Sequence, residues 1–321
     1  MTEDHDDSAP TTPPPGARWR LIGPGLVAAA TGVGAGDLVA TLVAGSKFGY
    51  ALLWAAVVGT LLKISLAEAV GRWSLASGRT IFEGWSSLGP GWFGGRLNWA
   101  SVYFGLYVVI WGFVYGATAM TASALPVAAL LDGTPLALDL KAWAMILGVA
   151  GLILVWFNRY PLFEKIMTGL VGVMFVTVVG LAAIVAPDLP ALVRGLVPTL
   201  PAGSAFYTLG LIGGAGGTIT LAAYGYWIGQ KAWRGPAWMR VMRLDNRVGY
   251  AVTGLFVVAM LIVGAELLHA SNIALAGGDR GLLDLDRVLR EPFGDGVGVM
   301  FLIGFFAPSF SSCAIVSGNS R

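Results

Sequence analysis

The sequence predicts an all-α protein that crosses a membrane several times, and three observations support this prediction. First, 56% of its residues are hydrophobic and only 12% are charged, with a mean hydropathy of +0.74, which is too apolar for a soluble domain. Second, the apolar residues form continuous stretches long enough to cross a bilayer as helices. Third, glycines cluster in the middle of two of these stretches, where they favour an interruption of the helix.

Eight apolar segments, separated by polar or Gly/Pro-rich breaks, have about the 20 residues that a transmembrane helix needs. Their hydrophobicity is continuous rather than alternating, which argues against the strands of a membrane β-barrel. The predicted spans are 21–45, 48–69, 98–124, 141–157, 162–186, 205–229, 249–270 and 296–317. Residues 1–17 are acidic and rich in Pro and Thr, so we expect a disordered cytoplasmic tail, and residues 18–321 form the transmembrane domain.

Charged and reactive residues exclude several classes of function. Placing the N-terminus in the cytoplasm puts most Lys and Arg residues in the loops on that side, so we predict a multi-pass protein of the plasma membrane with a cytoplasmic N-terminus. The basic residues form no extended tract, which argues against nucleic-acid binding. The chain has one cysteine, Cys313, and two histidines, His5 and His269, too few for a thiolate cluster or an enzyme's catalytic constellation. We therefore expect neither an enzyme nor a bound cofactor.

Glycine clusters lie in the middle of the first and the sixth predicted spans. They run from Gly32 to Asp37 and from Gly213 to Thr218, and each glycine costs a helix about 1 kcal/mol relative to alanine. Interrupted spans at matching positions are typical of an inverted repeat of five plus five helices, with the substrate between the two breaks. Repeat one then covers about 21–186, and an incomplete repeat two covers about 205–321. The alternative is that these glycines only permit close helix packing.

Asp37 is the acidic residue in the first of these clusters. Backbone carbonyls freed where the first half-helix ends, near Val33, can face a cation, and the positive end of the second half-helix favours an ionised carboxylate. An alternative role for Asp37 is the N-cap of the second half-helix, and the two roles can coexist. The lipid bilayer and a cation are therefore the partners that the residues themselves suggest.

Short motifs follow one another at the ends of the predicted spans. They are Gly23-Pro24-Gly25, Phe48-Gly49-Tyr50, Leu52-Leu53-Trp54, Gly78-Arg79-Thr80-Ile81-Phe82-Glu83, Arg159 with Phe163-Glu164-Lys165-Ile166 and Gly169-Leu170-Val171, and Pro187-Asp188 with Gly195 and Pro198. Together, from about residue 21 to about residue 270, these motifs resemble the Nramp family of proton-coupled divalent-metal transporters. The resemblance implies a LeuT-like fold in which the metal binds between unwound first and sixth helices.

The chain departs from the family pattern at the implied site. The family's first break reads Asp-Pro-Gly-Asn, whereas a gapless match gives Gly34, Ala35, Gly36 and Asp37, so that the carboxylate stands at the asparagine position. The family's sixth helix supplies a methionine and often a Pro-His pair, but residues 213–220 contain neither sulfur nor imidazole. The chain therefore lacks the thioether that helps to select softer transition metals.

The predicted metal site consists of oxygen ligands. We expect Asp37, the carbonyls of Val33 and Gly34, and the hydroxyl groups of Thr218 or Thr220 to contact the transported ion. Such ligands suit a hard divalent ion such as Mg²⁺ or Mn²⁺, and Mg²⁺ keeps several of its waters when it binds. The metal is thus a transported substrate and not a resident cofactor.

Four further polar side chains in or near the spans are candidates for proton or gating roles. Glu68 either handles protons or extends to the membrane surface. Glu266 and His269 are three residues apart, so they form either a proton-handling pair or interfacial hydrogen bonds. Tyr224 either gates the cytoplasmic side or serves in packing and in the interfacial aromatic belt. Residues 101–120 of the third span contain no acid or histidine, where family members use such groups, so proton coupling stays open.

A five-plus-five repeat needs ten helices, and the sequence supplies eight. We therefore expect a chain truncated at its C-terminal end, with repeat two incomplete. The leading prediction is secondary transport of divalent cations by alternating access. The alternatives are a transporter of small organic solutes of the amino-acid type on the same fold, against which the negative charge of Asp37 argues, and a truncated fragment that does not transport.

Overall fold

The computed structural model describes most of the chain, and helices make up nearly all of what it describes. The described residues are 12–14, 21–32, 35–88, 91–92, 97–156, 160–185, 187–214, 218–269, 290–291 and 294–318. Within them, the strands β1 (Gly91–Trp92) and β2 (Leu97–Asn98) form a short antiparallel pair. The predicted all-α fold is therefore confirmed, with this small hairpin as an addition. The metal site and the terminal tail fall largely outside these ranges.

The first and the sixth predicted spans are each described as two helices. The first is α1 (Pro24–Gly32) and α2 (Ala35–Phe48), and the sixth is α9 (Ala205–Gly214) and α10 (Thr218–Gln230). Residues 33–34 and 215–217, between the halves, lie outside the described residues. The helix ends thus fall within the two glycine clusters, as the sequence predicts.

Of the other spans, the fourth and fifth keep their predicted lengths within a shift of one or two residues, and the remaining four are longer than predicted. In chain order, these spans are η2 (Gly49–Leu52) with α3 (Leu53–Ser77), α5 (Trp99–Leu131), α6 (Leu140–Trp156), α7 (Tyr160–Ile184), α11 (Met239–Val263) continued by the π-helical η4 (Gly264–His269), and α13 (Asp295–Gly318). Three short helices connect them, namely α4 (Ile81–Ser86), α8 (Leu189–Gly195) and η3 (Pro236–Trp238). Within the described part of the chain, four helical stretches are long and apolar enough to cross a membrane: Ala40–Ser77, Trp99–Leu131, Glu164–Ile184 and Pro236–His269.

The start of α11 corrects the seventh predicted span, 249–270. The helix begins ten residues earlier, at Met239, because its polar first turns are packed inside the protein. Asp245 and Asn246 are fully buried there. A hydropathy criterion begins a span after the last charged residue. It therefore leaves out polar residues that the protein buries and pairs with hydrogen-bond partners.

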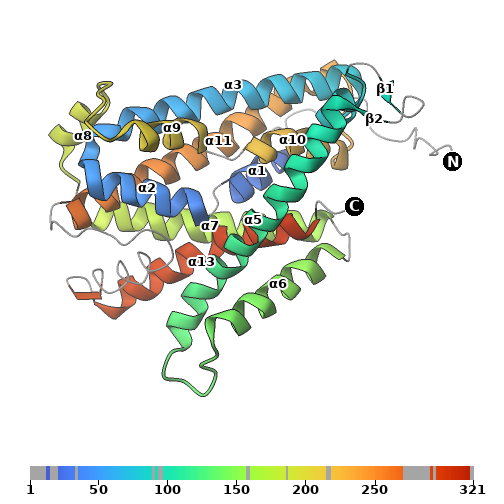
Figure 1. Cartoon of the computed structure of the whole chain (residues 1–321). Helices are drawn as coiled ribbons and strands as arrows, with labels where there is room; N and C mark the ends of the chain where they lie inside the picture. The colour runs from blue at the N-terminus through green and yellow to red at the C-terminus, as the bar shows by residue number, and fades with distance from the viewer. Residues whose placement is uncertain are drawn as a thin grey trace.

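Helices at matching places in the two predicted repeats contact each other. α1 contacts α10 and α2 contacts α9, so the two interrupted spans lie side by side, and α3 packs on α11 and α5 on α13. In Figure 1, α1 and α10 occupy one half of the bundle and α2 and α9 the other half. This pattern of contacts is what a two-fold relation between the repeats produces.

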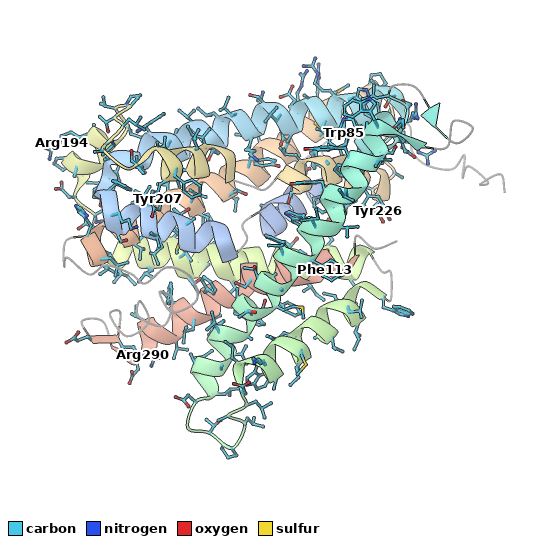
Figure 2. The ribbon with its side chains drawn as sticks, viewed as in Figure 1. Trp85, Phe113, Arg194, Tyr207, Tyr226 and Arg290 are labelled. Carbon is cyan, nitrogen blue, oxygen red and sulfur yellow. The ribbon has the colours of Figure 1, made fainter. Side chains whose placement is uncertain are left out.

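Among the four helical stretches long enough to cross a membrane, the one that contains α11 is the most buried and α5 is the least buried. In the most apolar window of Pro236–His269, 72% of residues are buried, compared with 11% for Trp99–Leu131. Phe113 on α5, labelled in Figure 2, is 79% exposed, and Leu106 and Val114 on the same helix are also exposed. Such a face is compatible with contact to lipid or to further helices, and not with water.

Candidate functional site

The four half-helices of the interrupted spans end near the middle of the bundle. α1 ends at Gly32 and α2 begins at Ala35, while α9 ends at Gly214 and α10 begins at Thr218 (Figure 1). Carbonyl groups at the two C-terminal ends and N–H groups at the two N-terminal ends have no partner within their own helices. The middle of the bundle therefore combines electronegative and electropositive helix ends, as a site for an ion between broken helices requires.

The predicted metal ligands fall on or next to these helix ends. Val33 and Gly34 lie outside the described residues, as do the side chains of Asp37 and Thr218. The backbone of Asp37 belongs to the first turn of α2, and Thr218 is the first residue of α10. Thr220 is buried in α10 with 8% of its surface exposed. The position of the helices agrees with the prediction, and the ligand set itself stays a prediction.

The best-defined polar site in the bundle, around Asp245 of α11, was not predicted from the sequence. Its side chain is fully buried and accepts three hydrogen bonds. Gly23 N–H donates to Oδ1 at 2.9 Å, Gly25 N–H donates to Oδ2 at 2.7 Å, and the Tyr224 hydroxyl donates to Oδ2 at 2.8 Å. The carboxylate thus caps the N-terminus of α1 from a different helix.

The Gly-Pro-Gly motif has a direct role in this cap. Pro24, the first residue of α1, has no N–H, so the donors come from the glycine on each side of it. The start of a helix leaves N–H groups unpaired and carries a partial positive charge, which a carboxylate neutralises. A lone acid within the basic stretch Arg240–Arg247 is the sequence signal that could have pointed to Asp245.

Tyr224 connects the cap to α10. It is fully buried, and besides the bond to Asp245 its hydroxyl lies 3.2 Å from Met242 O. Its burial agrees with the packing alternative, and its predicted role in gating stays a prediction. Tyr226, two residues further on, is 47% exposed and labelled on the surface in Figure 2.

Two ion pairs lie at the same end of the bundle as Asp245. Lys231 Nζ is 2.7 Å from Glu164 Oε2, which joins the end of α10 to α7. Arg243 Nε is 2.9 Å from Glu68 Oε1, which joins α11 to α3. Glu68 is therefore held in an ion pair. The sequence pattern predicts either proton handling or extension to the membrane surface, and it does not predict this contact.

Glu266 and His269 interact with different partners at the opposite end. Glu266 Oε1 accepts hydrogen bonds from the Tyr50 hydroxyl at 2.5 Å and from Asp188 N–H at 2.9 Å. His269 Nδ1 lies 2.9 Å from Ser46 O, to which it donates. Both residues belong to the π-helical turn η4. Residues three apart lie on one face of an α-helix, but the wider turn of a π-helix separates them. Glu266 and His269 thus have separate hydrogen-bond partners among the described residues, and the choice between their two predicted roles stays a prediction.

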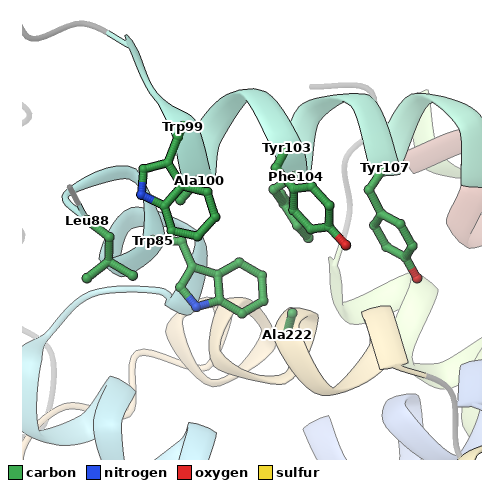
Figure 3. A pocket seen from close by; sticks show the side chains of 8 residues that line it. All are labelled: Trp85, Leu88, Trp99, Ala100, Tyr103, Phe104, Tyr107 and Ala222. Carbon is green, nitrogen blue, oxygen red and sulfur yellow. The ribbon is translucent and has the colours of Figure 1, made fainter. Parts of the chain in front are cut away.

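An apolar pocket of about 470 Å³ lies between α4, α5 and α10. Figure 3 shows that aromatic rings from α4 and α5 form most of its wall, with Ala222 of α10 opposite. Its lining residues are Trp85, Leu88, Trp99, Ala100, Tyr103, Phe104, Tyr107 and Ala222. None of them is a carboxylate, so the pocket does not suit a hydrated divalent cation. Among the described residues, no group of three His, Cys, Asp or Glu side chains can hold a metal ion either.

The fold and the paired interruptions define a class of protein. A helical membrane protein in which two interrupted spans lie side by side, and in which helices at matching places of the two halves contact each other, has the architecture of an inverted-repeat secondary transporter.

Comparison with known proteins agrees with this class. The family model described as "Natural resistance-associated macrophage protein-like" (Nramp) matches residues 25–319. The chain is 25% identical over 329 residues to the divalent metal cation transporter MntH of Deinococcus radiodurans, covering 95% of this chain and 69% of that protein. It is 26% identical over 318 residues to the MntH of Mycobacterium leprae, covering 92% and 68% of the two chains.

Solved structures show the same fold. A mutant of the Eremococcus coleocola manganese transporter superposes with a TM-score of 0.70 at 16% identity, covering 97% of this chain and 68% of that chain. The same transporter in complex with an aromatic bis-isothiourea substituted compound gives a TM-score of 0.70 at 15% identity, covering 98% and 68%. The chain belongs to the Nramp family, and the predicted LeuT-like fold and transporter class are confirmed. It is therefore an integral membrane protein and not an enzyme.

Proposed function

We propose that this protein carries divalent metal cations across the membrane by alternating access, with the ion bound between the two interrupted spans. The observation that carries the proposal is the side-by-side arrangement of these spans, in which α1 contacts α10 and α2 contacts α9. Relatives that match more than nine-tenths of the chain bear the name divalent metal cation transporter, which supports the class of cargo.

The chemistry of the break residues favours a hard ion. The proposed ligands are Asp37, the carbonyls of Val33 and Gly34, and the hydroxyls of Thr218 or Thr220. All of them are oxygen ligands, which suit Mg²⁺ and Mn²⁺ better than softer metals. Thr220 supports this assignment because it is buried and belongs to the first turn of α10, which follows the break in the sequence.

The proposed orientation puts the Asp245 end of the bundle in the cytoplasm of the cell, at the plasma membrane. Basic residues gather at this end, where α3 and α10 finish and α11 begins. They are Arg72, Arg79, Lys231, Arg240, Arg243 and Arg247. Cytoplasmic loops of membrane proteins carry such an excess of Lys and Arg, which supports a cytoplasmic N-terminus before α1.

Uptake into proteoliposomes tests the function. The purified chain is compared with its Asp37→Ala variant for Mg²⁺, Mn²⁺ and Ca²⁺ uptake, with a panel of amino acids as the competing class of substrate. We expect uptake of Mg²⁺ or Mn²⁺ that falls about tenfold or more in the variant, because the ion loses its one charged ligand. Repeating the measurement at two pH values tests whether protons accompany the ion.

Asp132→Asn is the matched control. Asp132 is an exposed acid that follows α5, far in sequence from both breaks, so we expect its uptake to equal that of the wild type. Equal uptake by the wild type and Asp37→Ala would exclude the proposed ion site. Uptake of amino acids in place of metal would exclude the proposed cargo.

A further inference from the structure

We propose that Asp245 is a latch that holds α1 closed at its end of the bundle, and that the latch must open before this end of the protein can open. Asp245 is a positioning residue, since it contacts helix ends and not the ion. The consequence for transport rests on the alternating access proposed above. The latch itself does not, because it is a contact between described residues.

Both oxygens of the Asp245 carboxylate accept hydrogen bonds, and two N–H groups at the start of α1 donate to them. Asp245 accepts from Gly23 N–H and Gly25 N–H of α1, at 2.9 and 2.7 Å, and from the Tyr224 hydroxyl of α10 at 2.8 Å. Hydrogen bonds to a buried ionised group are among the strongest in proteins, and an unpaired buried carboxylate is very costly. The Asp245 side chain is fully buried. When α1 is released, water must therefore reach this carboxylate and replace the N–H donors of α1.

Backbone packing makes the docked position of α1 well defined. A Cβ on Gly25 would overlap the backbone oxygen of Asp245, and a Cβ on Gly249 would overlap the backbone oxygen of Gly25. α1 and α11 thus meet backbone to backbone next to the point where the carboxylate holds the helix end. Closely packed interfaces of this kind switch between discrete positions and do not deform gradually.

α1 depends on these contacts for its position. It has nine residues, and helices of this length are marginal without tertiary contacts. Tyr224 ties the same carboxylate to α10, and the Lys231–Glu164 ion pair lies against Gly23. The cytoplasmic halves of both interrupted spans are therefore held at one point. Because α1 ends at Gly32, beside the first break, its position also sets where the freed carbonyls lie.

Hydrogen–deuterium exchange of the full chain in nanodiscs tests the latch without any cargo. Asp245→Asn keeps the size of the side chain but removes its charge and turns an amide NH₂ towards one of the donors. We expect amides in residues 21–32 to exchange about tenfold faster, the loss of roughly one charge-assisted hydrogen bond, while α5 and α6 stay unchanged. Glu68→Gln is the control, because it breaks an ion pair of α11 at the same end without touching α1.

A second variant protects the test against misfolding. Gly249→Ala leaves the carboxylate intact but adds a Cβ at the backbone contact, so we expect faster exchange in the same segment. Tyr224→Phe removes one donor, and we expect a smaller increase, about threefold. Wild-type exchange of residues 21–32 in both Asp245→Asn and Gly249→Ala would overturn the proposal, as would an equal increase in Glu68→Gln.

Uptake then tests the role in transport. In Asp245→Asn we expect the maximal rate of metal uptake to fall about tenfold, because α1 no longer returns to its closed position in each transport cycle. The half-saturating concentration should stay within about threefold of the wild type, because Asp245 does not touch the ion. Faster exchange with a normal uptake rate would overturn the role in opening. If the wild type carries no metal, the proposed function fails, while the exchange results still decide whether the latch exists.

Discussion

The hydrogen bond between Tyr50 and Glu266 gives a quantitative prediction for the opposite end of the bundle. It joins η2 to η4, and Glu266 also accepts from Asp188 N–H ahead of α8. The O···O distance of 2.5 Å is typical of a hydroxyl group that donates to a carboxylate. Three segments far apart in the sequence are therefore joined through one side chain, and the perturbation is to remove the hydroxyl with Tyr50→Phe.

The magnitude follows from the kind of bond and its partial exposure. A hydrogen bond to a charged group contributes about 1.5–3 kcal/mol to stability. Because this pair is only partly buried, solvent weakens the bond, and we take a value at or just below the lower limit of this range, about 1–1.5 kcal/mol. Tyr50→Phe and Glu266→Gln should each destabilise the protein, and the double variant should cost about 1–1.5 kcal/mol less than the sum of the two.

Equilibrium unfolding in mixed detergent micelles measures this double-mutant cycle. Tyr207→Phe is the matched control at the same end, since its hydroxyl accepts from exposed Lys47 Nζ at 2.7 Å and should contribute less than about 0.5 kcal/mol. Residues that do not interact give additive effects within about 0.3–0.5 kcal/mol. A coupling free energy within this limit would refute the assignment of the bond as a stabilising contact.

Two further predictions concern helix packing and orientation. Gly59→Ala should lower the free energy of unfolding by about 1–3 kcal/mol, because its Cβ would overlap the backbone of α9 at Leu211, whereas Gly210→Ala, with open space around it, should have little effect in the same unfolding assay. In a Cys313→Ser background, a membrane-impermeant thiol reagent added to intact cells should label Arg194→Cys at α8 but not Arg79→Cys beyond α3. The reverse labelling would contradict a cytoplasmic N-terminus.

Local patterns in the sequence determined the class of fold. Continuous apolar stretches predict spans because lipid offers no partner for exposed backbone groups, so each crossing segment must satisfy itself as a helix. The two glycine clusters predicted the interruptions because the helical cost of glycine is a property of the residue and its neighbours. The ends of α1 and α2, and of α9 and α10, fall where these clusters predict.

The partners of the polar side chains were decided by the tertiary structure. Gly-Pro-Gly predicts the start of a helix, but the acceptor of its N–H groups, Asp245, lies 222 residues further along the sequence from Gly23. Glu266 and His269 look like neighbours in an α-helical pattern, yet a π-helical turn gives them separate partners. Hydropathy and spacing describe a residue and its near neighbours, whereas a buried carboxylate is stable only where the folded chain brings donors to it, so its position and role follow from the packing of the helices.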